Sequence, residues 1–217
     1  CDVARAGWSN TDFLNVTNNP FGTTAYPFTF ACRFYPTSVG ATQYMVYLTN
    51  NAQSDLFALS LGNTSKLRAN VAGAGSGNYS ESGAVVTANA WHTAVGVFTS
   101  TTSRTVYLDG VAGATDTVAR SPSLAQTKVF VGVQNGGNPF SGRIAEVAMW
   151  NTGLTADDVA SFNAGFSPLL IRPQSLIEYW PLFGAASPEP SLRNASNALS
   201  LTGAPSAASH PRVYAAA

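Results

Sequence analysis

The amino-acid sequence predicts an all-β fold, a two-sheet antiparallel jelly-roll sandwich with one short helix near 155–164. Three observations predict it: short apolar segments with a period of two, the turn-forming pair Asp109-Gly110, and one helix-start pattern at Thr155. Short strands separated by turn residues, with little helix between them, are typical of β-sandwiches. The length of 217 residues suits one such domain.

The segment 91–98 and the hairpin after it give the clearest pattern. Trp91, Thr93 and Val95 fall on one side of an extended chain and alternate with a second set of residues on the other side. The polar run 99–103 then turns the chain, and Asp109-Gly110 suits the positive backbone angles of a two-residue hairpin turn. The pattern therefore predicts a meander of antiparallel strands.

The remaining strands are predicted where apolar runs lie between clusters of Gly, Asn, Ser and Pro. In chain order, all strands are expected near 13–17, 26–36, 43–49, 55–61, 66–72, 84–98, 104–108, 128–134, 143–150, 179–182 and 199–202. Residues 1–12 are predicted to be an entry segment with Trp8 as its large apolar group, and residues 13–217 to form the domain. Cys32 is expected on the core face. For Cys1 three interpretations are left open: a processed terminus, a lipidation site, or a residue at which the sequence happens to begin.

One helix is predicted over 156–164. Thr155 occupies the cap position, Asp158 can reach back to the cap amide, and Gly165 supplies a left-handed stop. The following segment, 167–175, contains Pro168 and Pro173 and is therefore predicted to cross the molecule outside the sheets.

These landmarks resemble the laminin-G-like, concanavalin A-like lectin/glucanase superfamily, and the resemblance implies the sandwich fold. The residues that carry it are Trp91-His92 before a strand, Tyr107-Leu108-Asp109-Gly110 at the hairpin, Gly142-Arg143-Ile144-Ala145-Glu146-Val147 in a late strand, and Leu154-Thr155 at the helix start. The tail, Gly165 to Pro173 and then His210-Pro211-Arg212, is similar to the version in many bacteriophage and environmental bacterial proteins.

Composition excludes two classes of partner. Charged residues make up 10% of the chain and the formal net charge is zero, whereas nucleic-acid binding needs clustered Lys and Arg. No apolar run approaches the roughly 20 residues of a membrane span. We therefore expect neither a nucleic-acid nor a membrane partner.

The sequence also predicts that the protein is not an enzyme, with no catalytic residue. Glycan hydrolysis needs two paired carboxyl groups, and no two acids stand two or four positions apart. The adjacent pair Asp157-Asp158 belongs to the first turn of the helix, where acids favour the helix dipole. His92 and His210 are interpreted as structural residues.

No cofactor and no metal site are predicted. The loop 50–55 has oxygen atoms for calcium but one carboxylate, Asp55, whereas calcium generally takes 6–8 oxygen ligands. An Asn-rich turn is the favoured interpretation, and calcium stays the alternative.

Two loops offer the residue types that bind sugars, an aromatic face and amide side chains. Asn78 and Tyr79 lie in the Gly-rich stretch 73–83, and Asn135, Asn138 and Phe140 lie in the stretch 134–142. We interpret these five residues as a candidate glycan-binding site on exposed loops.

The favoured function is a structural or binding module, an accessory protein of a phage virion such as a capsid decoration or fibre component. Its expected partners are other virion proteins or copies of itself, with Trp8, Pro168 and Pro173 at the interface, and glycan binding is a candidate activity of the loops. The alternative is a secreted or cell-surface carbohydrate-binding, lectin-like module, with an extracellular in place of a virion location. This prediction rests on resemblance, because a fold does not determine a function.

Overall fold

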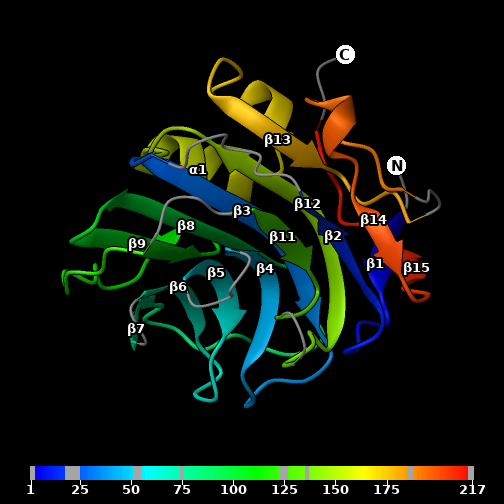
Figure 1. The fold of residues 1–217 in the computed structure, drawn as a ribbon, viewed down its shortest axis with the longest axis horizontal. Helices are drawn as coiled ribbons and strands as arrows, with labels where there is room; N and C mark the ends of the chain where they lie inside the picture. Colours follow the sequence, from blue (N-terminus) through cyan, green and yellow to red (C-terminus); the bar gives the residue numbers. More distant parts are fainter. Residues whose placement is uncertain are drawn as a thin grey trace.

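The computed structural model describes residues 3–17, 25–50, 55–73, 76–122, 127–134, 137–184 and 188–214, without the side chains of Val3 and Ser76. These residues form two stacked antiparallel sheets and one short α-helix (Figure 1). The predicted fold class is confirmed. Within the described part of the chain, no helix is long and apolar enough to cross a membrane.

The first sheet contains the N-terminal and C-terminal strands together with the strands that flank the predicted hairpin. Its spatial order is β10 (Val111–Ala112), β9 (Ser103–Leu108), β8 (His92–Ser100), β3 (Phe28–Pro36), β12 (Gly142–Trp150), β1 (Val3–Ala6) and β15 (Ser206–Ser209), with β13 (Leu176–Trp180) also paired to β12. Asp109 and Gly110 both have positive φ, 50° and 81°, as the hairpin prediction requires.

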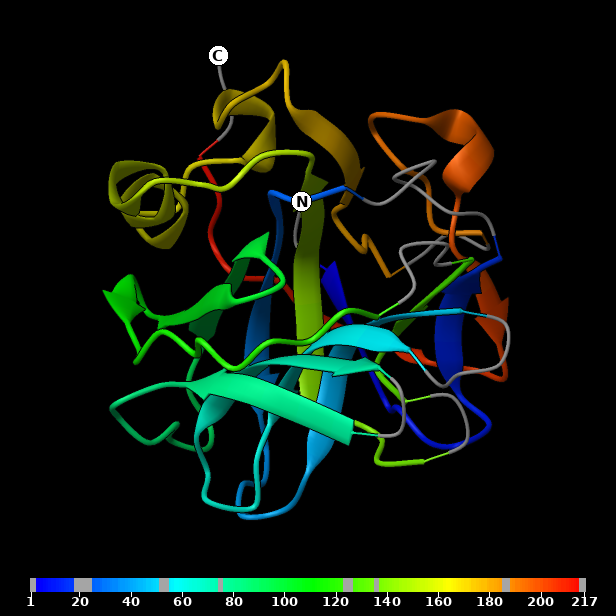
Figure 2. The same cartoon turned by 60° about the vertical axis from the view of Figure 1, so that its left-hand side comes forward.

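The second sheet is stacked on the first, and Figure 2 shows β5 and β6 crossing in front of β12. Its spatial order is β14 (Ser200–Thr202), β2 (Phe13–Val16), β11 (Lys128–Val131), β4 (Gln43–Thr49), β5 (Leu56–Leu61), β6 (Leu67–Gly73) and β7 (Ser76–Glu81). Two short 3₁₀ helices, η1 (Pro168–Leu170) and η2 (Ala195–Asn197), lie in the C-terminal part of the chain.

The main core lies between the sheets, and strand alternation decides which residues enter it. In β6, Leu67, Ala69 and Val71 join this core, whereas Arg68 and Asn70 point to the outer side. A second cluster covers the outer side of the first sheet, and a third, smaller cluster lies on the outer side of the second sheet. Polar residues on the outer faces are thus free to form sites without entering the core.

Helix α1 (Ala156–Asn163) confirms the predicted caps. Thr155 and Asp158 form a reciprocal capping box, in which the Thr155 amide donates to Asp158 Oδ2 at 2.9 Å. Gly165 has a φ of 103°, the left-handed conformation predicted for the stop. The helix buries Val159 and Phe162 against the outer side of the first sheet.

The entry segment is part of the domain, which corrects the prediction for its N-terminal end. Residues Val3–Ala6 form β1 between β12 and β15, and Trp8 is 7% exposed and belongs to the main core. A Cβ at Gly132 would overlap the Trp8 indole, so the two residues pack in direct contact. The Trp8 side chain is therefore not available as an interface residue. Pro168 is also buried, at the start of η1, whereas Pro173 is exposed.

Two further strand predictions need correction. Ser76–Glu81, predicted as a flexible loop, is the edge strand β7 paired to β6. The strand predicted over 84–98 begins only at His92, because residues 84–91 form bends and a turn instead. Cys32 lies in the main core as predicted, and Cys1 lies outside the described residues.

Candidate functional site

The outer faces of the two sheets each carry a hollow, so the two hollows lie on opposite sides of the main core. On the second sheet, residues of β4 to β7 line a hollow of about 280 Å³, here called the sheet hollow. The side chains that give the sheet hollow its chemistry are Tyr44, Ser60, Arg68, Asn70 and Tyr79.

Tyr79 is the exposed aromatic group of the sheet hollow, with 44% of the residue accessible. The guanidinium of Arg68 packs against its ring, 4.0 Å from the ring centroid. Arg68 is itself fixed, because its Nε donates to Glu81 Oε2 at 2.7 Å. Lys66 forms a longer ion pair, 3.8 Å, with the same carboxylate. The ring of Tyr79 is thus held in one orientation while much of it faces solvent.

Asn70 places an amide next to that ring. The β6–β7 register pairs Asn70 directly with Tyr79, and Asn70 Nδ2 donates to Ser60 Oγ at 2.8 Å. Across the hollow, Tyr44 packs edge-on against Tyr47, with ring centroids 5.5 Å apart. Burial raises the pKa of Tyr44, so its phenol stays neutral and can donate or accept a hydrogen bond. The sheet hollow therefore combines amide, hydroxyl and aromatic groups.

The structure brings together fewer of the predicted glycan residues than the sequence analysis expected. Asn78 and Tyr79 both line the sheet hollow, but as neighbours on a strand their side chains point to opposite faces, and Asn78 Oδ1 accepts a hydrogen bond from Arg120. Asn138 is exposed on a separate loop and donates to Gln134 Oε1 at 2.9 Å. Phe140 is 1% exposed and packs in the main core, which corrects its assignment to a surface site. Asn135 lies outside the described residues.

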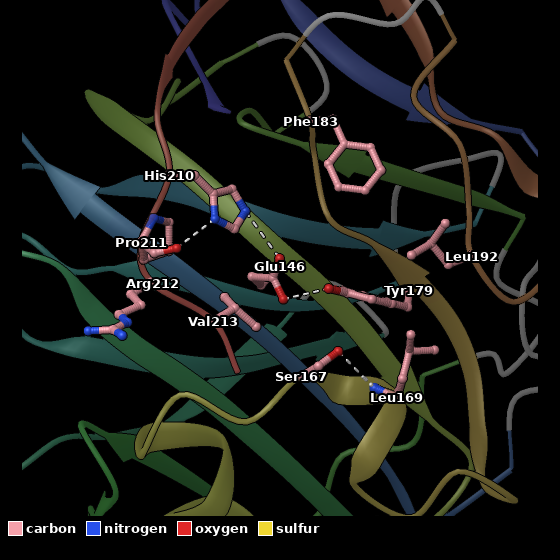
Figure 3. Close-up of a pocket in the computed structure, with 10 residues that line it drawn as sticks. All are labelled: Glu146, Ser167, Leu169, Tyr179, Phe183, Leu192, His210, Pro211, Arg212 and Val213. Atoms are coloured by element: carbon pink, nitrogen blue, oxygen red, sulfur yellow. Dashed lines mark hydrogen bonds and ion pairs between the residues drawn. The ribbon is translucent and has the colours of Figure 1, made fainter. Parts of the chain in front are cut away.

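The larger hollow, of about 460 Å³, lies on the outer side of the first sheet and is here called the Glu146 pocket (Figure 3). Its floor is formed by Glu146 of β12, Tyr179 of β13, Ser167 and His210, whose side chains converge in Figure 3. Its walls are formed by Leu169, Phe183, Leu192, Pro211, Arg212 and Val213.

Glu146 reaches this pocket because of a bulge in β12. The register with β3 changes between Ala145 and Ala148, where three steps along β12 match two along β3. Ile144 and Val147 both belong to the main core, so strict alternation from Ile144 would direct residue 146 into that core. The extra residue, with a φ of 55°, turns the carboxylate to the outer side of the sheet.

Glu146, Tyr179 and His210 form a buried hydrogen-bond set. Tyr179 Oη donates to Glu146 Oε2 at 2.6 Å, and His210 Nε2 lies 3.1 Å from Glu146 Oε1. His210 Nδ1 faces the carbonyl oxygen of Pro211 at 2.7 Å. Because both ring nitrogens face acceptors, the imidazolium is the form that satisfies them. Burial opposes this charge, but Glu146 and the carbonyls of Pro211 and Pro181 outweigh burial, so the pKa of His210 is raised.

The Glu146 pocket offers hydrogen bonds and apolar contact. Glu146 is the single acid among the described residues that line it. Glycoside hydrolysis generally uses two carboxyl groups in one cleft, so the pocket gives no support to that chemistry. In the described ranges, no group of three or more His, Cys, Asp or Glu side chains is arranged to hold a metal ion.

The family now follows from a direct sequence match. The sequence model of the concanavalin A-like lectin/glucanases superfamily matches residues 9–160. The chain belongs to this superfamily. The match includes the sheet hollow and Glu146 but ends before Tyr179 and His210, so superfamily membership does not account for the buried set. No curated protein matches the chain in sequence.

Solved structures with this fold include carbohydrate-binding proteins. A putative carbohydrate binding protein from Bacteroides ovatus has a TM-score of 0.67 at 16% identity, over 99% of this chain and 62% of that chain. The CBM40 of the Ruminococcus gnavus IT-sialidase, bound to α2,3 sialyllactose, has a TM-score of 0.59 at 14% identity, over 75% of this chain and 95% of that chain. A SAP-like pentraxin from Limulus polyphemus has a TM-score of 0.58 at 17% identity, over 75% of this chain and 81% of that chain. At these identities the likeness shows the fold alone.

Sequence reasoning missed most residues of both hollows. Arg68 and Asn70 could have been found, because they occupy alternate positions of a predicted strand whose other positions are apolar. Glu146 gave no such signal, since its partners Tyr179 and His210 are distant in the sequence and the bulge is not visible in the residue pattern.

Proposed function

We propose that the chain is a non-catalytic carbohydrate-binding domain, and that the sheet hollow is where it binds a glycan. The observation that carries the proposal is the exposed, fixed ring of Tyr79 directly beside the amide of Asn70 on the outer face of a sheet. The Bacteroides and Ruminococcus proteins named above, which share the fold, support this class of ligand by their own described properties. An extracellular location is part of the proposal.

Sugar rings have an apolar face of C–H groups and a rim of hydroxyls, and the sheet hollow presents a complement to each. The ring of Tyr79 covers the apolar face, and its orientation is set before binding by Arg68, so less rotamer entropy is lost. Asn70 and Ser60 supply donors and acceptors for hydroxyls, and the Lys66, Arg68 and Glu81 group beside them adds charge of both signs. A volume of about 280 Å³ holds one or two sugar residues.

A glycan array tests the proposal, followed by titration of the sugars that bind. Tyr79→Ala should weaken binding by about fivefold or more, because removal of a stacked aromatic group costs about 1–3 kcal/mol. Tyr214→Ala is the matched control, since Tyr214 is equally exposed, at 48% against 44%, but lies at the opposite outer face. Absence of any glycan ligand, or equal losses in the two variants, would contradict the proposal.

A role as a structural component of a phage virion stays a prediction. Part of its basis is the expectation that the entry segment, residues 1–12, contacts a neighbouring chain through Trp8. That segment instead pairs within the domain, through β1, and buries Trp8 in the main core. The virion role now rests on the similarity of the C-terminal segments, Gly165 to Pro173 and His210 to Arg212, to bacteriophage proteins. The sheet hollow favours the carbohydrate-binding alternative.

A further inference from the structure

We propose that the Glu146 pocket is a second binding site, and that its ligand is a neutral small molecule with hydroxyl groups at one end and an apolar ring at the other. An aryl glycoside has this chemistry. The pocket lies on the outer side of the first sheet, across the main core from the sheet hollow, so the inference does not depend on the proposed function of the sheet hollow.

The floor of the pocket is polar, buried and built around one strained residue. The side chains of Glu146 and His210 are each 2% exposed, and Tyr179 and Ser167 are 4% and 3% exposed. Glu146 adopts a φ of 55°, a conformation that costs a non-glycine residue about 1–2 kcal/mol. Strain of this kind persists where the surroundings determine it, and it is concentrated at functional sites.

Hydrogen-bond accounting shows what the floor can offer to a ligand. The protons of Tyr179 and His210 are already directed at Glu146 and at the carbonyl of Pro211. Each carboxylate oxygen of Glu146 accepts one of these bonds and has a further lone pair, whereas Tyr179 Oη already has a hydrogen bond with Ser167. The floor therefore presents acceptors, and a ligand fits it by donating hydrogen bonds.

The charges around the floor select a neutral donor. The carboxylate of Glu146 lies 3.1 Å from His210 Nε2, and Arg33 acts on Glu146 electrostatically from β3. Arg212 lies exposed at the rim. An ammonium group would approach both arginines, and an anion would place oxygen atoms without a proton against the carboxylate of Glu146. Hydroxyl groups donate without either penalty.

The walls specify the other end of the ligand. Leu169, Phe183, Leu192 and Val213 line the pocket above the floor, as Figure 3 shows. Leu169 and Leu192 are 38% and 45% exposed, so their side chains leave apolar surface at the pocket that a ligand can cover. With about 460 Å³ available, the pocket accommodates a sugar ring on the floor and an aromatic ring between the leucines.

The test is a titration of the whole chain with small p-nitrophenyl compounds. Binding is measured by calorimetry and by ligand-observed NMR. A panel of neutral p-nitrophenyl glycosides is compared with p-nitrophenyl phosphate and with 4-nitrobenzylamine, which carry a negative and a positive charge. We expect at least one glycoside to bind more tightly than about 1 mM, and both charged compounds to bind at least tenfold more weakly.

Two arginine substitutions locate the binding. Leu192→Arg places a long charged side chain across the pocket, whereas Leu170→Arg changes a leucine of similar exposure, 43%, that does not line it. We expect the first to weaken binding by at least about tenfold and the second by less than about twofold. Thermal unfolding of each variant verifies that it is folded.

Three results would overturn the inference. These are no binding of any glycoside up to about 10 mM, preferential binding of a charged compound, or equal effects of the two arginine variants. Tyr79→Ala separates the two sites: glycoside binding that survives this change and is lost in Leu192→Arg supports the Glu146 pocket, and the reverse pattern assigns the compound to the sheet hollow.

Discussion

Replacement of Glu146 by glutamine tests the electrostatics of the buried set without any ligand. Glutamine keeps the shape of the side chain and removes its charge. Its carbonyl oxygen can still accept from Tyr179 Oη, and its amide can donate to His210 Nε2 once that ring is neutral and protonated on Nδ1. All donors and acceptors of the set can then be paired, but both hydrogen bonds to residue 146 join uncharged groups.

The size of the effect follows from this difference. Hydrogen bonds to a charged group contribute about 1.5–3 kcal/mol each and neutral ones about 0.5–1.5 kcal/mol, and desolvation of the carboxylate offsets part of the gain. We expect Glu146→Gln to lower the free energy of unfolding by about 1–3 kcal/mol below neutral pH. Glu146→Ala removes the carboxylate that pairs with both His210 and Tyr179 and should cost about 3–5 kcal/mol.

The pH dependence is the decisive part of this prediction. The pKa of His210 is raised in the folded protein, so its stabilising contribution is fully present below the ordinary histidine value and is lost as the pH rises through the folded value. In Glu146→Gln the carboxylate's part of this contribution is lost, and only the carbonyls of Pro211 and Pro181 remain to oppose burial. The stability difference between wild type and variant should therefore be large in acid and should shrink as the pH rises.

Urea unfolding at about pH 5.5 and about pH 8.5 measures the effect, and NMR titration of the histidines assigns it. His92, whose pKa is also raised as the hydrogen bond and charge of Asp109 outweigh burial, contributes equally in both proteins and cancels in the comparison. Tyr179→Phe is the control, since it removes one bond to Glu146 and keeps the pair with His210. A stability difference that is independent of pH in Glu146→Gln would refute the charged pairing.

Three further predictions concern the fold that positions the sites. Trp8→Ala should lower the free energy of unfolding by about 3–5 kcal/mol, because the indole is 7% exposed in the main core; a change under about 1 kcal/mol would mean that the entry segment is not part of the domain. Gly132→Ala should cost at least about 2 kcal/mol, from its φ of 89° and from overlap with the Trp8 indole, and thermal unfolding would show a matching loss. Thr155→Ala should cost about 1 kcal/mol through loss of the capping box, and calorimetry that finds no change in stability would contradict the cap assignment.

The sequence allowed the sheets to be predicted because their signals are local. Alternation over a few residues places Leu67 and Ala69 inside and Arg68 outside, and the pair Asp109-Gly110 fixes a turn on its own. The strand β7 was missed for the same reason: the segment around Ser76–Glu81 is rich in Gly and Ser, and its extended form depends on pairing with β6.

The candidate sites were harder to predict because their residues meet only through tertiary structure. Tyr79 was singled out from the sequence as a candidate binding group, and the structure pairs it with Asn70 of the neighbouring strand, which the sequence did not indicate. Phe140 shows the opposite error, since an aromatic residue in a loop-like sequence is a core residue here. Composition does not distinguish an exposed aromatic residue such as Tyr79 from a buried one such as Phe140, because their positions in the folded structure determine their exposure.

The bulge in β12 shows how one added residue converts a buried strand into part of a site. Without it, the side chain of Glu146 would point between the sheets into the main core, where burial of an unpaired carboxylate among apolar side chains is costly. With it, the same carboxylate meets His210 and Tyr179 on the outer side, and the strand resumes core packing at Val147. The backbone strain at Glu146 is thus coupled to the pairing that offsets it. Glu146→Gln therefore measures how far this pairing stabilises the fold, whereas Leu192→Arg measures ligand binding at the apolar wall of the pocket.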